Sequence, residues 1–198
     1  IAYSCRTFFK DDAKIIISTD RDFFQLVDER TSIFRPVKTK ENPRGELIDL
    51  DWMMQKEDVF PPNYALLKAI VGDKSDNIGG VKGVGEPTAK TDFPLLNNME
   101  EAGVDDILEY AGKQKEKKYE KYIDNAELMR RNYGIVQLLD IDVNMQSIQA
   151  LERSYENKEL KFNSYQLRLK LLNEDISPNN IDNWVSSFMS VQREPLTF

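Results

Sequence analysis

Two pairs of aspartates are the residues in this chain best suited to chemistry. Asp20 and Asp22 stand two residues apart, and Asp73 and Asp76 stand three residues apart farther along the chain. If the fold brings the pairs together, carboxylates at about 4 Å repel by roughly 4 kcal/mol per pair at an effective dielectric constant near 20, and a divalent cation relieves this repulsion. Carboxylate oxygens favour Mg²⁺ or Mn²⁺. All four aspartates are therefore candidate catalytic residues and metal ligands, although either pair alone is more simply explained as helix N-caps.

The composition excludes several other kinds of active site. The 198 residues include no histidine, which removes Ser-His-Asp and Cys-His catalysis and most zinc sites. The formal net charge of −7 argues against a generally basic nucleic-acid binder but leaves room for local basic patches. Cys5, the one cysteine, cannot form an internal disulfide and is expected to be a buried structural thiol. With no long apolar run and no signal-peptide pattern at the start, we expect a cytoplasmic protein.

A glycine-rich turn follows the second aspartate pair directly. The segment from Gly79 to Gly85 can bring bare backbone N–H groups against an anion, and Pro87 suits the first turn of a following helix. Such a turn contacts a nucleic-acid backbone without reading its sequence. The alternative is a helical hairpin in which the glycines merely form the turn. The candidate DNA-backbone-binding residues are Gly80, Val81, Lys82, Gly83, Val84, Gly85, Thr88 and Lys90.

Alternating elements near the start of the chain place the first aspartate pair. Residues 1–9 have a helical apolar pattern, 14–19 read as a strand buried on both faces, 23–27 as a helix and 31–36 as a second strand. This order predicts an α/β parallel sheet. Asp20 then lies at the carboxyl end of a strand, where open parallel sheets bind their ligands.

The remainder of the chain is more polar and reads mainly as helix. A polar loop precedes a short helix at 50–55, and we predict an α/β part at residues 1–60 and a helical subdomain at 61–198. Residues 135–140 carry the one apolar strand-like signal in the later part of the chain. The predicted helices of the subdomain are 63–71, 105–111, 113–132, 159–172 and 180–189.

Two long segments resemble the linked signatures of 5′ nucleases. Residues 18–27, reading STDRDFFQLV, and residues 72–89, reading GDKSDNIGGVKGVGEPTA, look like those of flap endonucleases, the 5′-nuclease domain of bacterial DNA polymerase I and phage 5′-3′ exonucleases. Residues 131–142 are similar, more weakly, to the ribonuclease H branch of T-even phages. The resemblance extends over most of the chain, and residues 143–198 contribute least to it.

The resemblance implies the C-terminal part of a PIN-like nuclease core, followed by a helix-three-turn-helix DNA-binding element at about 63–96. It implies a structure-specific 5′ nuclease that removes flaps, RNA primers or duplex 5′ ends by two-metal hydrolysis. Asp20, Asp22, Asp73 and Asp76 would hold the second Mg²⁺ or Mn²⁺, and the turn would hold duplex backbone, with a bound K⁺. The expected substrates are branched or nicked DNA and RNA–DNA hybrids.

Two features of the family are missing from this sequence. The acids for the first metal ion belong to a strand and helix that would precede Ile1, so this chain alone is expected to be inactive. Family members usually carry a lysine near Glu86, and Pro94 soon interrupts the second helix of the turn. The alternatives are a non-catalytic helix-hairpin-helix-type DNA-binding module and an unrelated α/β protein whose aspartates are caps.

Two further segments have weaker functional interpretations. Lys117 and Lys121 repeat at a four-residue spacing and are candidate DNA contacts, although a solvated helix with i,i+4 ion pairs is the commoner explanation. Residues 192–198, reading QREPLTF, loosely resemble peptides that dock replication nucleases on sliding clamps. The protein is expected to act as a monomer in the cytoplasm, of the host if it comes from a phage.

Overall fold

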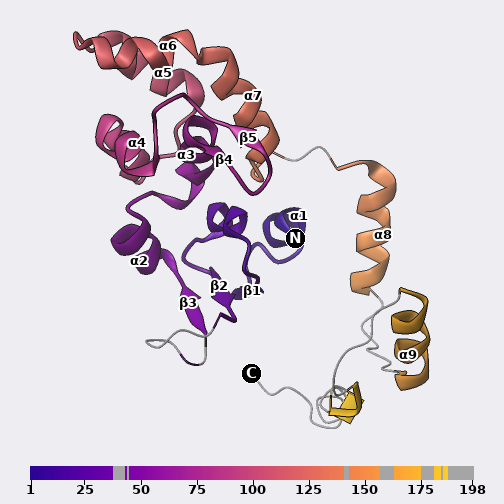
Figure 1. Cartoon of the computed structure of the whole chain (residues 1–198). Coiled ribbons are helices and arrows are strands. Elements are labelled where there is room, and N and C mark those ends of the chain that lie inside the picture. Colours follow the sequence, from indigo (N-terminus) through magenta and orange to yellow (C-terminus); the bar gives the residue numbers. More distant parts are fainter. Residues whose placement is uncertain are drawn as a thin grey trace. The chain divides into compact units, whose positions relative to one another are not determined.

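The computed structural model describes residues 1–37, 43, 45–140, 143–156, 163–174, 181–183 and 185–186 (Figure 1). The chain divides into two compact units, Ile1–Asp142 and Val143–Phe198. The fold is mixed α/β and rich in helix. The predicted boundary at residue 61 falls within the first unit, and its assignment to a nuclease core and a helical subdomain stays a prediction.

The predicted strand and helix alternation is present at the start of the chain. The elements are α1 (Ala2–Thr7), β1 (Lys14–Ile17), the 3₁₀ helix η1 (Arg21–Leu26), β2 (Thr31–Arg35) and β3 (Glu46–Ile48). β1 and β2 are parallel as predicted, whereas β3 pairs antiparallel to β2 and lies beyond a stretch that reads as polar loop. Ile16, Ile33 and Ile48 lie side by side across the three strands and are buried, which forms the core face of the sheet.

The prediction that the first strand is buried on both faces is wrong. Ile15 and Ile17 are 65% and 72% exposed, and Leu47 on β3 is 50% exposed. Side chains alternate across a strand, so these residues point away from the face that Ile16 packs. In the part of the chain that the structure describes, this outer face is open to solvent, and the apolar run therefore overstated the burial.

The centre of the first unit is the buried helix α3 (Tyr64–Val71). Six of its eight residues are buried, and it packs against α7 (Ala126–Val136) and α4 (Glu86–Asp92). The chain reaches α3 through α2 (Leu50–Trp52), a π-helical turn η2 (Met53–Glu57) and the 3₁₀ turn η3 (Pro61–Asn63). It leaves α3 through a short hairpin of β4 (Gly72–Asp73) and β5 (Ile78–Gly79). The helices predicted at 50–55 and 63–71 are therefore confirmed, the first continuing as the π-helical turn.

The continuous helix predicted at 113–132 is wrong. After the 3₁₀ turn η4 (Pro94–Asn97), α5 (Val104–Lys113) ends with Gln114 as its C-cap. Helical structure resumes with η5 (Lys117–Tyr119), α6 (Glu120–Asp124) and α7. The break lets Tyr119 and Tyr122 pack against Phe93, with ring centroids 5.9 and 4.6 Å away. Tyr122 donates a hydrogen bond to the buried carboxylate of Asp92 at 2.5 Å. The packing of these aromatic residues therefore explains why the four-residue spacing of the lysines does not produce one continuous helix.

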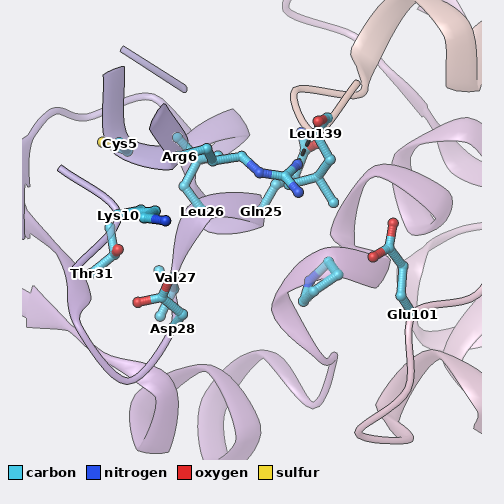
Figure 2. A pocket seen from close by; sticks show the side chains of 11 residues that line it. Cys5, Arg6, Lys10, Gln25, Leu26, Val27, Asp28, Thr31, Glu101 and Leu139 are labelled. Atoms are coloured by element: carbon cyan, nitrogen blue, oxygen red, sulfur yellow. Dashed lines mark hydrogen bonds between the residues drawn. The ribbon is translucent and has the colours of Figure 1, made fainter. Parts of the chain in front are cut away.

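The strand-like signal at residues 135–140 is also wrong, because α7 extends to Val136. Gln25, which is buried on η1, donates to the carbonyl of Val136 at 2.9 Å and accepts from the N–H of Leu138 at 2.9 Å. Figure 2 shows Arg6 reaching from α1 to donate to the carbonyl of Leu139, beside a cavity of about 290 Å³. The bonds of Gln25 attach the end of α7 to η1, the segment that bears Asp22, and the bond of Arg6 attaches the residues after α7 to α1.

The second unit contains α8 (Met145–Glu156) and α9 (Ser164–Asn173). α9 confirms part of the helix predicted at 159–172, and residues 181–183 and 185–186 are helical, as predicted for 180–189. Within the described residues, no helix is long and apolar enough to cross a membrane. The tail at 192–198, for which a sliding-clamp contact is predicted, lies outside the described residues.

Candidate functional site

Three of the four predicted aspartates come together in space. Asp22, Asp73 and Asp76 each offer a carboxylate oxygen, and these oxygens lie within 4.8 Å of one another. The β4–β5 hairpin explains the geometry, since Asp73 pairs with Ile78 and the intervening turn brings Asp76 back toward Asp73. Asn77 closes that turn in the left-handed region, with φ of 57°, which asparagine tolerates better than most residues. The convergence on which the metal hypothesis depends is therefore present for these three.

Asp20 takes a different position from the other aspartates. Its side chain accepts a hydrogen bond from the backbone N–H of Asp22 at 2.9 Å and so forms the N-cap of η1. Asp20 lines the same cleft as Asp73 but does not belong to the cluster of three. Its observed role is to fix the start of the 3₁₀ helix that carries Asp22.

A lysine that the sequence reading missed lies among the acids. The ammonium of Lys68, on α3, pairs with Oδ1 of Asp22 and with Oδ2 of Asp73, the latter at 2.5 Å. The second oxygen of Asp73 accepts from the N–H of Ser75 at 2.9 Å. A lysine inside the apolar segment YALLKAIV was the available signal, because a charged residue in a buried helix requires a partner.

The acids differ in protonation because their surroundings differ. Hydrogen bonds from Lys68, followed by those from Ser75, lower the pKa of Asp73 to about 2. Burial first, and then the charges of Asp20 and Asp73, raise the pKa of Asp22 overall, although Lys68 acts to lower it. Burial alone would lower the pKa of Lys68, but its bonds to Asp22 and Asp73 raise it overall. The site therefore combines a carboxylate whose ionised form is stabilised by hydrogen bonds with one whose ionised form is disfavoured by burial.

A cleft of about 620 Å³ joins the acidic cluster to the glycine turn. Its lining includes Lys68, Asp73, Val84, Gly85 and Glu86. Because one cleft reaches both Asp73 and the end of the glycine turn, a phosphodiester chain lying in it could contact both.

Arg21 connects the walls of this cleft. Its guanidinium lies 2.9 Å from Oε2 of Glu57 and 3.6 Å from Oε1 of Glu86, and it stands over the rings of Phe24 and Tyr64, 5.6 Å from each centroid. Planar guanidinium groups suit such combined pairing and stacking. Arg21 therefore ties the segment bearing Asp22 to the first residue of α4.

Two glycines of the turn are explained by different features of the structure. A Cβ on Gly80 would lie 2.1 Å from the carbonyl carbon of Val71, so Gly80 allows the hairpin to pack against the end of α3. Gly83 has φ of +77°, which favours glycine, and open space around it. The predicted phosphate contact through Gly80 thus has a competing explanation in packing.

The backbone N–H groups of the turn divide into two sets. Val81 and Val84 are buried, and their N–H groups donate to the carbonyls of Ile70 at 2.8 Å and Val81 at 3.1 Å. Over the described part of the chain, the N–H groups of Lys82, Gly83 and Gly85 have no backbone acceptor. The second set is therefore the one available to an anion.

The predicted cationic and hydroxyl contacts are also unequal. Lys82 and Thr88 are exposed, whereas the ammonium of Lys90 donates to the carbonyl of Glu57 and lies 3.9 Å from Oε2 of Glu86. Lys90 therefore points into the ion-pair network around Arg21 rather than away from it.

The later lysine pair is divided by the break in the predicted helix. Lys117 is exposed on η5. The ammonium of Lys121 lies 3.8 Å from Oδ2 of Asp92 and stands 4.8 Å from the ring centroid of Tyr122. Lys118, between them, donates to Oδ1 of Asp92 at 2.7 Å. Lys117 and Lys121 therefore do not lie on one face of a single helix, as their spacing had predicted.

The three clustered carboxylates suit a hard divalent cation, one that prefers oxygen ligands. Three carboxylates supply oxygen ligands, and the ammonium of Lys68 already shows that a cation fits between Asp22 and Asp73. Neither histidine nor the thiol of Cys5 contributes to the cluster. The residues therefore fit Mg²⁺ or Mn²⁺ better than metals that prefer nitrogen or sulfur.

Comparisons with known proteins identify the family. The model described as "5′-3′ exonuclease, C-terminal SAM fold" matches residues 59–168, and the chain belongs to this family of 5′-3′ exonucleases and flap endonucleases. The sequence-based resemblance to 5′ nucleases is thereby confirmed, while the likeness of residues 131–142 to the T-even branch stays a prediction.

Similar sequences come from two kinds of bacterial protein. DNA polymerase I of Thermus thermophilus is 40% identical over 74 residues, which are 37% of this chain and 8% of the polymerase. A 5′-3′ exonuclease of Mycoplasmopsis pulmonis is 39% identical over 92 residues, which are 46% of this chain and 28% of that protein. The chain thus spans a small part of these relatives.

Similar solved structures come from phage T5. A mutant T5 5′-exonuclease superposes with a TM-score of 0.56 and 27% identity, covering 70% of this chain and 53% of that one. The T5 5′-exonuclease with bound zinc has a TM-score of 0.56 and 28% identity, covering 70% and 48%. The T5 flap endonuclease in complex with DNA and metal ions has a TM-score of 0.55 and 26% identity, with the same coverage. Two of these neighbours hold metal ions, one of them divalent zinc, and one is in complex with DNA.

Proposed function

We propose that this chain supplies the second-metal half of the active site of a structure-specific 5′ nuclease. The observation that carries the proposal is the convergence of Asp22, Asp73 and Asp76. Asp73 of this cluster lines the same cleft as Val84 and Gly85, at the end of the glycine turn. Membership in the 5′-3′ exonuclease family gives this arrangement its chemical context. The reaction is hydrolysis of phosphodiesters near a 5′ end by a two-metal mechanism.

The aspartates have distinct roles in this proposal. Asp22, Asp73 and Asp76 would hold Mg²⁺ or Mn²⁺, and Asp20 fixes the backbone of η1 while remaining a candidate ligand at the cleft. A divalent cation held there would lower the pKa of a bound water and stabilise charge on the phosphate oxygens. Ser75 keeps Asp73 oriented, since both its N–H and its hydroxyl donate to Oδ1 of that carboxylate.

The glycine turn would bind the phosphate backbone of duplex DNA. The N–H groups of Lys82, Gly83 and Gly85, which have no backbone acceptor among the described residues, and the exposed ammonium of Lys82 support this role. The ion pair between Arg21 and Glu86 links the segment that bears Asp22 to the helix that follows the turn. The helix-three-turn-helix assignment at 63–96 and its K⁺ belong to the same proposal.

The proposed substrates are branched or nicked DNA and RNA–DNA hybrids. The T5 flap endonuclease complexed with DNA and metal ions supports nucleic acid as the substrate class. The acids for a first metal ion are proposed to come from polypeptide outside these 198 residues. The activity therefore belongs to the complete nuclease, in which this chain would form the DNA-holding and second-metal part.

The test is Mg²⁺-dependent cleavage of a 5′-labelled flap duplex by the complete protein that contains this sequence. Asp73→Asn should lower cleavage by about 100-fold or more, because removing a ligand lowers metal affinity and transition-state stabilisation together. Asp51→Asn is the matched control, since Asp51 is an exposed carboxylate on α2 outside the cluster. Normal cleavage by Asp73→Asn would overturn the metal assignment.

The same assay separates the enzyme from the non-catalytic alternative. A DNA-binding module would retain flap binding in Asp73→Asn and in wild type alike, and neither would cleave with Mg²⁺. Binding measured in EDTA by fluorescence anisotropy, beside cleavage in Mg²⁺, distinguishes these cases. Cleavage lost in the variant with binding retained supports the nuclease.

A further inference from the structure

The ammonium of Lys68 occupies the position that a cation needs in the acidic cluster. It bonds to Asp22 and Asp73 at once, and all three side chains are mostly shielded, with exposures of 12%, 23% and 10% for Lys68, Asp22 and Asp73. Asp76 is exposed, and no salt bridge to it is found in the part of the chain that the structure describes. Two carboxylates are thus neutralised from within the protein, while the third faces the solvent.

We infer that Lys68 is an internal cation that competes with a divalent metal ion for Asp22 and Asp73, and so sets the metal affinity of the site. The inference rests on the proposed function, because it takes the three aspartates as the metal ligands. Lys68 is in this sense a positioning residue, which acts on the reaction through the metal ligands.

Competition follows from the geometry. An ammonium at hydrogen-bond distance from both carboxylates uses the oxygen lone pairs that a metal ion requires at about 2.0–2.1 Å in the case of Mg²⁺. A lysine side chain can withdraw its charge, since its four-carbon stem has several rotatable bonds. The backbone of Lys68 cannot move with it, because the flanking residues Leu67 and Ala69 are fully buried. Entry of the metal ion therefore requires the ammonium to swing away from the acids.

Lys68 also has a role when no metal ion is bound. Asp22 is mostly shielded from solvent and lies close to Asp73, so removal of the ammonium would take away the counter-charge that these two carboxylates share. A purely structural ion pair would explain the same contacts. The two roles differ in one result: loss of a competitor raises metal affinity, whereas loss of a structural support lowers it or leaves it unchanged.

The experiment is a calorimetric titration of Mn²⁺ into the chain and into Lys68→Met, in metal-free buffer at fixed salt. Methionine keeps an apolar stem and removes the charge. The Kd for Mn²⁺ should fall by about tenfold or more, since a unit charge within about 4 Å of the ion contributes strongly even at an effective dielectric constant near 20. Lys74→Met is the matched control, because Lys74 is an exposed lysine lining the same cleft, and its Kd should change by less than about threefold.

Thermal unfolding of the same proteins gives a readout that does not depend on fitting a binding curve. Without metal, Lys68→Met should unfold at a lower temperature than wild type, and Mn²⁺ should raise its Tm by more than it raises that of wild type. Lys68→Arg keeps the charge and should bind Mn²⁺ no more tightly than wild type. A cooperative unfolding transition in Lys68→Met also shows that this variant is folded.

The outcomes separate this inference from the proposed function. Equal or weaker Mn²⁺ binding by folded Lys68→Met overturns the competition, and loss of binding in Asp73→Asn would then still support the metal site. If neither wild type nor Lys68→Met binds Mn²⁺, the metal site and the competition both fail. Mn²⁺ binding that appears only after Lys68 is replaced supports competition in its strongest form.

Discussion

Replacement of Gly80 with alanine should damage both the fold and the acidic cluster. A Cβ at this position would lie 2.1 Å from the carbonyl carbon of Val71, 2.2 Å from its oxygen and 2.5 Å from the nitrogen of Gly72. All three are backbone atoms, so no side-chain rotation can relieve the collision. Relief requires the β4–β5 hairpin to move away from the end of α3, and Asp73 would move with it.

The expected cost can be estimated from these contacts. Overpacking a tight site typically costs about 1–3 kcal/mol, and backbone collisions on three atoms place Gly80→Ala near the upper end, at about 3 kcal/mol. At about 2–4 °C per kcal/mol for a domain of this size, the Tm should fall by about 6–12 °C. Urea unfolding followed by far-ultraviolet circular dichroism measures the free energy, and Mn²⁺ titration should show weaker binding.

The adjacent glycine provides the control. A Cβ on Gly79 would meet no heavy atom within 4 Å, and its φ is not in the positive range that disfavours side chains. Gly79→Ala should therefore change the free energy of unfolding by less than about 0.5 kcal/mol. If Gly79→Ala and Gly80→Ala unfold at the same urea concentration, close packing of the hairpin against α3 is refuted.

Three other outcomes follow from the contacts described. Asp92→Ala removes the acceptor of Lys118 and of the buried Tyr122 hydroxyl and should cost about 2–3 kcal/mol in urea unfolding, whereas Asp92→Asn should cost less. Burial alone would raise the pKa of Asp92, but those two donors lower it overall. Its contribution to stability is therefore complete above the unfolded pKa of about 3.9 and is lost as the pH falls through the lower folded pKa, so the difference in stability between wild type and Asp92→Asn should shrink as the pH falls below about 4. Lys82→Glu should weaken duplex binding and reduce the salt slope by about 1 or more, and an equal effect from Lys117→Glu would place η5 in the DNA footprint as well.

The sequence predicted those parts of the site that depend on local patterns. The strand before Asp20 and the helix before Asp73 both appear, and the short spacing between Asp73 and Asp76 suits a tight hairpin turn. The convergence of these segments required a topological assumption, that an aspartate after a strand lies at a ligand-binding edge. Asp22 lies in the cluster of three carboxylates, whereas Asp20 is observed as the cap of η1, and ligand binding at this edge stays a prediction.

The features that the sequence did not predict depend on contacts between distant segments. Lys68 pairs with Asp22 across 46 positions, so no local pattern identifies its partner. The helix predicted at 113–132 failed because Tyr119 and Tyr122 gain more by packing on Phe93 than the lysines gain from a continuous helical face. β3 was missed because its three residues are too few for a periodic signal.

The sequence predicted where the glycine turn lies but not why each of its glycines is needed. Its sequence gave no means of separating a glycine that lets an anion approach from one that lets the backbone pack. The structure separates them, since Gly80 abuts Val71 whereas Gly83 has open space and a positive φ. Asn132, buried on α7, donates to the carbonyl of Gly79 at 2.8 Å and holds the same hairpin from a segment far along the chain.

The position of a bound metal ion is the most direct test of the proposed nuclease site. Anomalous diffraction from crystals of this chain grown with Mn²⁺ should give a peak within bonding distance of Asp22, Asp73 and Asp76, with the ammonium of Lys68 displaced from between the first two. A Mn²⁺ ion bound elsewhere while Lys68 still bridges Asp22 and Asp73 would contradict the assignment of these aspartates as the metal ligands.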